Sequence, residues 1–290
     1  MIKIENCEFL ENASLKDFCT FKIGGCAKYL FIVHTTDALI EVCKKCACVN
    51  IKYKVIGLGA NLLFSDFGYN GAIIVNRSKN IEFCKNIAVA DSGTHVTTLI
   101  QKCLQKNLSG IENLAGIPST VGGAVVNSLG AFDTNFSDFV ETVECFDLAE
   151  NKAFTLNHKD CNFGYRTSLF KKQNYLITRV KLKFLQVDKE ETKLKMMSAL
   201  TKKKSTQPLE HPSAGSIFKR SDIIPAQIID RLGLKGLKIG GAEISKKHAG
   251  FIINTDNATA RDVLTLIEII KEQVYTAYHK TLETEIEIIT

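Results

Sequence analysis

Two glycine-rich segments, each beside a short apolar run, constrain how this chain can fold more than any other feature. The first loop is Gly57-Leu58-Gly59-Ala60-Asn61, directly after the strand-like run Tyr53–Ile56. The second loop spans residues 116–123, with the sequence Gly-Ile-Pro-Ser-Thr-Val-Gly-Gly. Glycine leaves backbone N–H groups uncovered, so an anionic ligand can approach them closely. We therefore expect two tight turns that hold a large phosphorylated cofactor.

The two loops match neither of the common nucleotide-binding patterns. The dinucleotide-binding pattern needs a third glycine where this chain has Leu62, and no acidic residue ends a following strand at the right distance. The phosphate-binding pattern Gly-x-x-x-x-Gly-Lys-Ser/Thr does not occur. One glycine loop alone could be an ordinary turn. Two loops flanked by hydroxyl residues, among them Ser92 and Thr120, favour a phosphate cradle.

Hydropathy and charge argue against several classes of protein. No apolar run approaches the roughly 18 residues of a membrane-spanning helix, and the first residues show no signal-peptide pattern. We therefore expect a cytoplasmic protein without membrane insertion. The net charge of +6 suits anionic ligands but does not indicate a nucleic-acid partner. The basic run Lys202-Lys203-Lys204 lacks interleaved aromatic residues, and we interpret it as the solvated end of a helix.

The ten cysteines indicate neither a zinc site nor a disulfide framework. Cys43, Cys46 and Cys48 lie close together, but no second pair of ligands follows at metal spacing, and no metal is expected. Leu39, Val42, Cys43 and Cys46 recur at helical spacing, which places two thiols on the core face of one helix. We expect reduced, mostly buried thiols.

Strand-like and helix-like runs alternate along the chain, which predicts an α+β fold with mixed sheets. Strands are expected at residues 29–33, 53–56, 72–75, 87–90 and 143–147, from 175 onward, and at 251–253 and 285–289. Helices are expected from residue 36, over 96–104 with Thr94 as the cap, and from Pro225. A long last helix begins at a capping box of Thr259 and Asp262. The lysine- and glutamate-rich stretch 187–208 predicts a polar helix and a domain boundary.

Seven groups of motifs follow one another along the chain. They are Val55–Asp66, Leu108–Glu112 with residues 115–125, Phe163-Gly164-Tyr165-Arg166-Thr167-Ser168, Gln207–Lys219, Ile239–Ser245, Lys247–Phe251 and Leu282-Glu283-Thr284-Glu285. In this order they resemble the UDP-N-acetylenolpyruvoylglucosamine reductase (MurB) family, from about Thr20 to the last residue. The chain lacks a long tyrosine-bearing insertion, and in this it is similar to the shorter, type II form.

The resemblance implies a particular domain organisation. An FAD-binding region of the vanillyl-alcohol-oxidase/PCMH type, with two subdomains, is followed by a C-terminal α+β substrate-binding domain. The expected boundaries are residues 1–75 and 76–188 for the two FAD-binding subdomains and 205–290 for the C-terminal domain. The last strand of that domain could return to the FAD-binding region.

The resemblance also implies a reaction in peptidoglycan precursor synthesis and cell-wall biogenesis. NADPH reduces the flavin, whose N5 gives hydride to C3 of the enolpyruvyl ether of UDP-N-acetylglucosamine, and a proton delivered to C2 completes UDP-N-acetylmuramate. Arg166 matches the residue that holds the charge on the substrate carboxylate, because a guanidinium stays cationic and pairs bidentately. Ser216 matches the proton donor, and Glu285 the glutamate that assists Arg166. Taken alone, Ser216 could be a turn serine and Glu285 could lie on a solvated edge strand.

The remaining site residues come from the same motifs. The positions expected to hold FAD without a covalent bond are Gly57, Leu58, Gly59, Ala60, Asn61, Leu62, Ser92, Gly116, Ile117, Pro118, Thr120, Gly122 and Gly123. Tyr165 and Lys219 are expected to bind substrate. The expected partners are small molecules, NADPH and UDP-N-acetylglucosamine enolpyruvate, and the protein is expected to be a monomer.

The chain departs from the family pattern in four places. Thr284 stands where the family has proline, and Arg220-Ser221 where Asn-Pro is common. Residues 127–132 differ from the usual Met-Asn-Ala-Gly-Ala-Tyr, and Ser119 takes a glycine position. No departure removes a proposed catalytic group.

Two other interpretations stay open at this point. Another flavoenzyme on the same fold, a 2-hydroxy-acid or alcohol oxidase or dehydrogenase, would often tether its flavin through histidine, and His95 is the nearby candidate. A nucleotide-sugar binding module without enzymatic activity would carry no flavin.

Overall fold

The chain forms two compact units, and each combines segments that are distant in the sequence. The structure, a computed structural model, describes residues 4–290. The first unit comprises the segment ending at residue 10 together with residues 30–57 and 72–203. The second unit comprises residues 11–29, 58–71 and 204–290. Each unit contains both helices and strands, as the α+β prediction requires.

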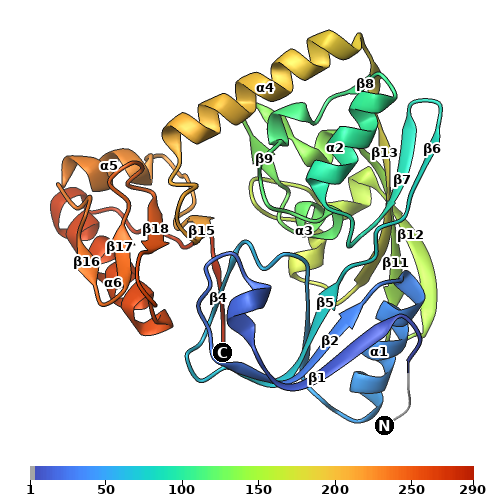
Figure 1. Cartoon of the computed structure of the whole chain (residues 1–290), viewed down its shortest axis with the longest axis horizontal. Coiled ribbons are helices and arrows are strands. Elements are labelled where there is room, and N and C mark those ends of the chain that lie inside the picture. Colours follow the sequence, from blue (N-terminus) through green and yellow to red (C-terminus); the bar gives the residue numbers. More distant parts are fainter. Residues whose placement is uncertain (1–3) are drawn as a thin grey trace. The chain divides into compact units, whose positions relative to one another are not determined.

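A five-stranded antiparallel sheet is the centre of the first unit (Figure 1). Its order is β12(Lys152–Asn157), β11(Val140–Asp147), β13(Leu176–Lys183), β7(Ile87–Asp91) and β6(Ile81–Cys84). The helices α2(Val96–Gln105) and α3(Val121–Val126) pack their apolar side chains against it in one core. This core supports the second glycine loop, because the last residues of the loop form the first turn of α3.

A second sheet carries the first glycine loop. Its order is β1(Cys7–Ser14), β2(Cys26–Val33), β5(Tyr69–Asn76) and β3(Tyr53–Ile56), with β3 parallel to β5. The helix α1(Thr36–Cys48) connects β2 to β3, and its buried face includes Leu39, Val42, Cys43 and Cys46. The prediction that Cys43 and Cys46 are core residues is confirmed. Burial raises the pKa of Cys43 to about 12 and that of Cys46 to about 11, so both thiols stay protonated near neutral pH.

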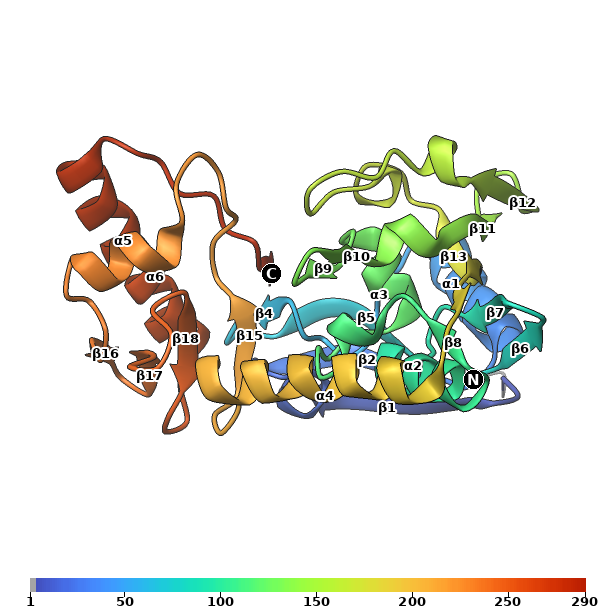
Figure 2. The same cartoon turned by 90° about the horizontal axis from the view of Figure 1, so that it is seen from above.

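The second unit contains a four-stranded antiparallel sheet, ordered β15(Ser213–Ser216), β18(Phe251–Asn254), β17(Ala242–Ile244) and β16(Lys238–Ile239). The helix α6(Ala260–Tyr278) contacts β16, β17 and α5(Pro225–Arg231) (Figure 2). A separate parallel pair joins β19(Glu287–Ile289) to β4(Leu62–Phe64), directly after the first glycine loop. The last strand of the chain therefore returns to this loop.

The remaining elements are short, apart from one long helix. They are β8(Leu108–Ser109), β9(Gly130–Ala131), β10(Thr134–Asn135), β14(Leu185–Gln186), α4(Lys189–Thr206), and 3-10 helices at Leu15–Phe18, Glu112–Leu114, Phe136–Phe139, His158–Cys161 and Leu169–Lys171. The predicted polar helix corresponds to α4. Along residues 4–290, no helix combines the length and apolar character needed to cross a bilayer.

The helix caps and strand ends give one confirmation and three corrections. The capping box of Thr259 and Asp262 at α6 is confirmed in both directions. Thr94 is not the cap of α2, because His95 holds that position and the Thr94 hydroxyl donates to the Asn80 carbonyl at 3.4 Å. The closing strand begins at residue 287 rather than 285. Residues 121–126 form α3, a helix that was not among those predicted.

Candidate functional site

The first glycine loop makes a left-handed turn that only glycine fits. Gly59 has φ +62°, and a Cβ at this position would lie 2.3 Å from the Phe18 carbonyl oxygen and 2.8 Å from Cys19 Cα. The amides of Leu58, Gly59 and Ala60 donate to no acceptor within residues 4–290. Gly59 is buried. A buried residue with an unpaired N–H is costly unless a ligand or water accepts the bond.

Replacing Gly59 with alanine should therefore disrupt this loop. The left-handed backbone alone costs an L-residue about 1–2 kcal/mol. The contacts with the Phe18 carbonyl oxygen and with Cys19 Cα add to that cost, because these backbone atoms cannot easily move aside. We expect a lower free energy of unfolding and weaker FAD binding, measured by denaturation and by flavin titration. Gly233→Ala is the matched control, because Gly233 also has positive φ but nothing within 4 Å of its Cβ position. Equal FAD affinity in the two variants would contradict this account of the loop.

The second glycine loop presents a similar set of open amides. Gly116 has φ +75°, and the amides of Gly116, Ser119 and Thr120 donate to no acceptor among the described residues. Gly57 lies against this loop, since a Cβ there would be 2.4 Å from the Thr120 hydroxyl. Ile117 is partly buried on the core, whereas Pro118 is exposed. The amides of Gly116, Ser119 and Thr120 could thus bind oxygen atoms of an anionic ligand.

Gly122 and Gly123 lie in the first turn of α3, and their amides are already occupied. Thr120 caps the helix by accepting from the Gly123 amide at 3.2 Å, and the Gly122 amide donates to the Ser92 carbonyl at 2.7 Å. A Cβ on Gly122 would lie 3.0 Å from Ser92 Cβ. These glycines therefore allow α3 to approach Ser92, whereas the open amides belong to the residues that precede them.

Ser92 sits in a buried polar network that the sequence did not reveal. Its hydroxyl accepts from the Asn76 amide nitrogen at 2.8 Å, and Asn76 Oδ1 accepts from the Ser78 backbone N–H at 3.0 Å. Gly93 must be glycine, because a Cβ there would lie 2.5 Å from Asn76 Oδ1. Asn76, at the end of β5, thus connects that strand to Ser92, whose carbonyl in turn accepts from the Gly122 amide of the second glycine loop.

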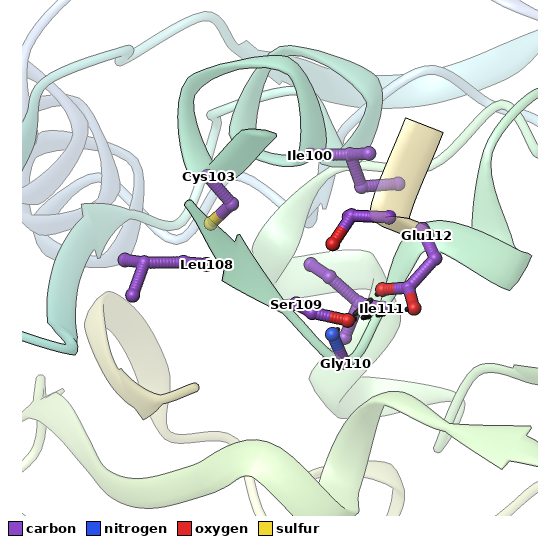
Figure 3. A pocket seen from close by; sticks show the side chains of 8 residues that line it. Ile100, Cys103, Leu108, Ser109, Gly110, Ile111 and Glu112 are labelled. Atoms are coloured by element: carbon purple, nitrogen blue, oxygen red, sulfur yellow. Dashed lines mark hydrogen bonds between the residues drawn. The ribbon is translucent and has the colours of Figure 1, made fainter. Parts of the chain in front are cut away.

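A small cavity lies beside the segment that leads into the second loop (Figure 3). Within it, the buried Glu112 carboxylate accepts from the Ser109 hydroxyl at 2.8 Å and from the Gly110 amide at 2.6 Å. The cavity volume of about 10 Å³ holds no more than about one water molecule. The cavity is therefore not a substrate site, and Glu112 serves to hold the backbone ahead of the loop.

Lys203 contradicts the interpretation of residues 202–204 as a solvated helix end. Its side chain is 2% exposed, and its ammonium donates a hydrogen bond to the Ala115 carbonyl, next to Gly116. The spacing of Thr192, Met196 and Ala199 along α4 could have revealed this, since these residues and Lys203 follow one helical stripe. Thr192 and Ala199 are buried, and Met196 packs on the core.

The burial of Lys203 predicts a pH-dependent stability. Because burial disfavours the ammonium, the pKa of Lys203 falls from 10.5 to about 8 in the folded protein. Between these values the unfolded chain binds more protons than the folded one, so the free energy of unfolding rises with pH. The charge penalty, at most about 3 kcal/mol, is fully present below pH 8 and relieved by pH 10.5. The stability advantage of Lys203→Met should therefore shrink across this window in denaturation experiments, and a constant difference would contradict it.

Arg166 lies at a strained position in a two-residue turn of the first unit. Gly164 and Thr167 exchange both backbone hydrogen bonds, at 3.0 and 3.2 Å, with Tyr165 and Arg166 between them. Arg166 has φ +55°, a conformation that costs an ordinary side chain about 1–2 kcal/mol. Such strain is typical of functional positions held by their surroundings.

Hydrogen bonds to neighbouring elements hold this turn. The Arg166 Nη2 donates to the Gly130 carbonyl at 2.9 Å, and its guanidinium lies 5.5 Å from the centre of the Tyr165 ring. The buried Ser168 hydroxyl donates to the Val126 carbonyl, the last residue of α3, at 2.8 Å. Ser168 therefore ties the arginine turn to the helix that follows the second glycine loop, a role that sequence reasoning missed.

In the second unit, backbone pairing brings Ser216 and Glu285 together. Ser216 ends β15, and the following residue, Ile217, accepts a hydrogen bond from the Glu285 amide at 2.7 Å. The bridge continues between Phe218 and Thr284. The Thr284 amide takes no part in it, because the flanking residues make both hydrogen bonds. The proline of the family pattern, which has no N–H, would therefore cost no hydrogen bond of this bridge.

The first glycine loop joins the same cluster through Asn61. Its side-chain amide donates to the Glu285 carbonyl at 2.9 Å, and its own carbonyl accepts from the Glu287 amide at 2.9 Å. Leu62 follows as the first residue of β4. Lys219 is half-buried and forms an ion pair with Glu283. The second unit thus gathers Asn61, Ser216, Lys219 and Glu285, whereas Arg166 and Tyr165 belong to the first unit.

The donor set of the loops fits FAD. Open amides in a glycine turn can bind the oxygen atoms of a pyrophosphate without any basic side chain, and each unit contributes three of them. In agreement, residues 27–157 match the family model of the FAD binding domain. Residues 207–289 match the model of the UDP-N-acetylenolpyruvoylglucosamine reductase C-terminal domain. The expected fold class is confirmed, and the chain is an FAD-binding oxidoreductase.

The similarity to proteins of known family covers nearly the whole chain. The UDP-N-acetylenolpyruvoylglucosamine reductase of Caldicellulosiruptor bescii is 39% identical over 292 residues, which cover 99% of this chain and 93% of that protein. The Thermotoga maritima reductase is 39% identical over 275 residues, 93% of this chain and 94% of the relative. The crystal structure of the reductase (MurB) from Thermus caldophilus matches with a TM-score of 0.83 and 33% identity, over 98% of this chain and 99% of that one.

The chain therefore belongs to the UDP-N-acetylenolpyruvoylglucosamine reductase family. The resemblance stated from the sequence motifs is confirmed. The alternatives of an oxidase on the same fold and of a binding module without activity are not favoured by these relatives.

Proposed function

We propose that this protein reduces UDP-N-acetylglucosamine enolpyruvate to UDP-N-acetylmuramate, with FAD as cofactor and NADPH as reductant, in peptidoglycan precursor synthesis. The observation that supports the proposal is the backbone hydrogen bond from Glu285 to Ile217, which brings together the segments that carry the Ser216 hydroxyl and the Glu285 carboxylate, next to Asn61. This pair suits the addition of hydrogen across a carbon–carbon double bond beside a carboxylate.

The two glycine loops hold FAD through their open backbone amides. Leu58, Gly59 and Ala60 of the first loop and Gly116, Ser119 and Thr120 of the second supply these donors. When bound, FAD carries hydride from NADPH to C3 of the enolpyruvyl group. Gly122, Gly123 and Ser92 support the second loop from below.

Arg166 stabilises the negative charge that grows on the substrate as C3 accepts hydride. The electron pair of the double bond moves toward C2 and the attached carboxylate, and a guanidinium binds such an oxygen pair in a bidentate manner. The tight turn and the Gly130 carbonyl fix the direction of the Arg166 side chain. Tyr165 is 55% exposed beside it and can contact the substrate.

Ser216 then gives a proton to C2, and Glu285 assists Arg166 in polarising the carboxylate. The Ser216 side chain is exposed and forms no hydrogen bond with the described residues, so its hydroxyl is available to a ligand. A serine hydroxyl is a weak acid and can protonate only a strongly basic carbon at short range. Lys219 contributes a positive charge for the anionic substrate.

The finer points of the assignment stay predictions. They are the division into residues 1–75, 76–188 and 205–290, the monomeric state, the preference for NADPH, and the cytoplasmic location. Sedimentation tests the monomeric state, and a comparison of the reduction rates with NADPH and NADH tests the preference for NADPH.

Product analysis tests the proposed function. Purified protein loaded with FAD is incubated with NADPH and UDP-N-acetylglucosamine enolpyruvate, and the products are separated and weighed by mass spectrometry. We expect one UDP-N-acetylmuramate, two mass units heavier than the substrate, for each NADPH consumed. NADPH oxidation that does not depend on the substrate would reject the proposal.

A further inference from the structure

Lys203 is a buried cation that the proposed chemistry leaves without a role. It lies near the end of α4 and is one of the largest fully buried side chains of the molecule. Burying an ammonium costs free energy that an apolar side chain in the same place would not cost. A role for the charge would explain its presence here. Lys202, its neighbour, is exposed, and both ammonium groups lie over the Phe132 ring, at 5.7 Å for Lys203 and 4.7 Å for Lys202.

The contact of Lys203 is with the backbone of the second glycine loop. Its ammonium donates to the Ala115 carbonyl, and its Cδ lies 3.7 Å from where a Cβ on Gly116 would be. Leu200, one turn earlier on α4, comes within 2.8 Å of the same point. Two side chains of one helix therefore lie beside this part of the loop, while Gly116 itself stays exposed.

The geometry of that peptide gives the contact a consequence. In a planar trans peptide the carbonyl and the next N–H point in opposite directions. A donor that holds the Ala115 carbonyl on the α4 side therefore turns the Gly116 N–H to the other side. That N–H is one of the open amides of the second loop, and Gly116, with φ +75°, could otherwise rotate with little resistance.

We propose that Lys203 is a positioning residue for cofactor binding: it holds the Ala115 carbonyl so that the Gly116 amide is directed to the bound ligand before the ligand arrives. The inference rests on the proposed assignment of the second loop to FAD. The Phe132 ring adds a second contact to the ammonium, because a cation is attracted to the face of an aromatic ring.

The test compares Lys203→Met with Lys202→Met. Both variants remove one positive charge over the same ring, and Lys203 is the residue whose ammonium donates to the Ala115 carbonyl. Methionine keeps an unbranched apolar side chain only one heavy atom shorter than that of lysine. We expect Lys203→Met to raise the FAD dissociation constant about tenfold in flavin titrations, the effect of losing one hydrogen bond to a charged group. Lys202→Met should stay within about twofold of the parent protein.

Two further measurements on the apoproteins separate positioning from structural support. Amide hydrogen exchange should accelerate at residues 115–120 in Lys203→Met and not in Lys202→Met, while thermal stability stays the same or rises. A loss of stability with unchanged FAD affinity would overturn the proposal and leave Lys203 a packing residue. Equal loss of FAD affinity in both variants would also overturn it, since charge alone would then be responsible.

Gly116→Ala distinguishes failure of this inference from failure of the loop assignment. A methyl group there meets Leu200 and forces the left-handed backbone, so it should weaken FAD binding if the loop holds the cofactor. If Gly116→Ala weakens binding and Lys203→Met does not, the role of Lys203 is rejected alone. If neither variant changes FAD affinity, the assignment of the loop is rejected together with it.

Discussion

Replacing Arg166 with glycine should slow reoxidation of the reduced flavin by the substrate about a thousandfold, while the free energy of unfolding changes by no more than about 1 kcal/mol. The first effect follows because loss of a preorganised group that stabilises transition-state charge costs about 10²–10³ in rate. The second follows because glycine relieves the strain at φ +55° and so offsets the lost hydrogen bond to the Gly130 carbonyl.

Arg166→Ala and Arg166→Lys are the matched comparisons. Alanine removes the same guanidinium but keeps the strain, so this variant should unfold about 1 kcal/mol more readily than Arg166→Gly at the same low activity. Lysine keeps the charge without the planar pair of donors and should recover only part of the rate. Single-turnover kinetics with pre-reduced protein measures the step. Normal reoxidation in Arg166→Gly would remove the residue from the mechanism.

Ser216→Ala should produce the other large effect and confine it to one half of the reaction. Loss of the proton donor is expected to slow reoxidation by the substrate about 10²–10⁴-fold, the usual contribution of general acid catalysis. Reduction by NADPH needs no proton at C2 and should keep its rate. Stability should stay within about 0.5 kcal/mol, because the Ser216 side chain is exposed and makes no hydrogen bond with residues 4–290.

Thr20→Ala provides a control that also removes a hydroxyl group from the neighbourhood of β15. Its hydroxyl donates to the Ser213 carbonyl at 2.7 Å, at the start of the same strand, so this variant tests whether a disturbed β15 alone lowers the rate. We expect Thr20→Ala to reoxidise at nearly the parent rate. If Thr20→Ala and Ser216→Ala lose the same activity, or if both half-reactions run normally in Ser216→Ala, the assignment of Ser216 as proton donor fails.

Local sequence patterns predicted much of the fold because they depend on near neighbours. The stripe of Leu39, Val42, Cys43 and Cys46 and the capping box of Thr259 follow from helical periodicity and from side chains three residues apart. The strand β3 before the first glycine loop is equally local. The motif order also carried the family assignment across the entire chain.

The errors occurred where a distant segment decides the outcome. Lys203 is buried with its ammonium donating a hydrogen bond to the Ala115 carbonyl, 88 positions earlier in the chain. A run of three lysines does not reveal such a distant partner. Thr94 donates to the carbonyl of Asn80, directly before β6, and His95 holds the cap position of α2.

The roles of Gly122 and Gly123 could not be separated from those of Gly116 by composition alone. Thr120 starts a helix between them, so the later amides donate within the protein while the earlier ones stay open. Only the backbone conformation distinguishes a glycine that binds a ligand from one that permits close packing.

An anaerobic stopped-flow experiment on the purified FAD-loaded protein tests the central claim most directly. NADPH is added first and UDP-N-acetylglucosamine enolpyruvate second, while absorbance is followed in the flavin band. The account predicts bleaching on the first addition and full recovery on the second. Bleaching without recovery would contradict the assigned substrate, and a protein that shows no flavin band even with added FAD would contradict the assignment of both glycine loops.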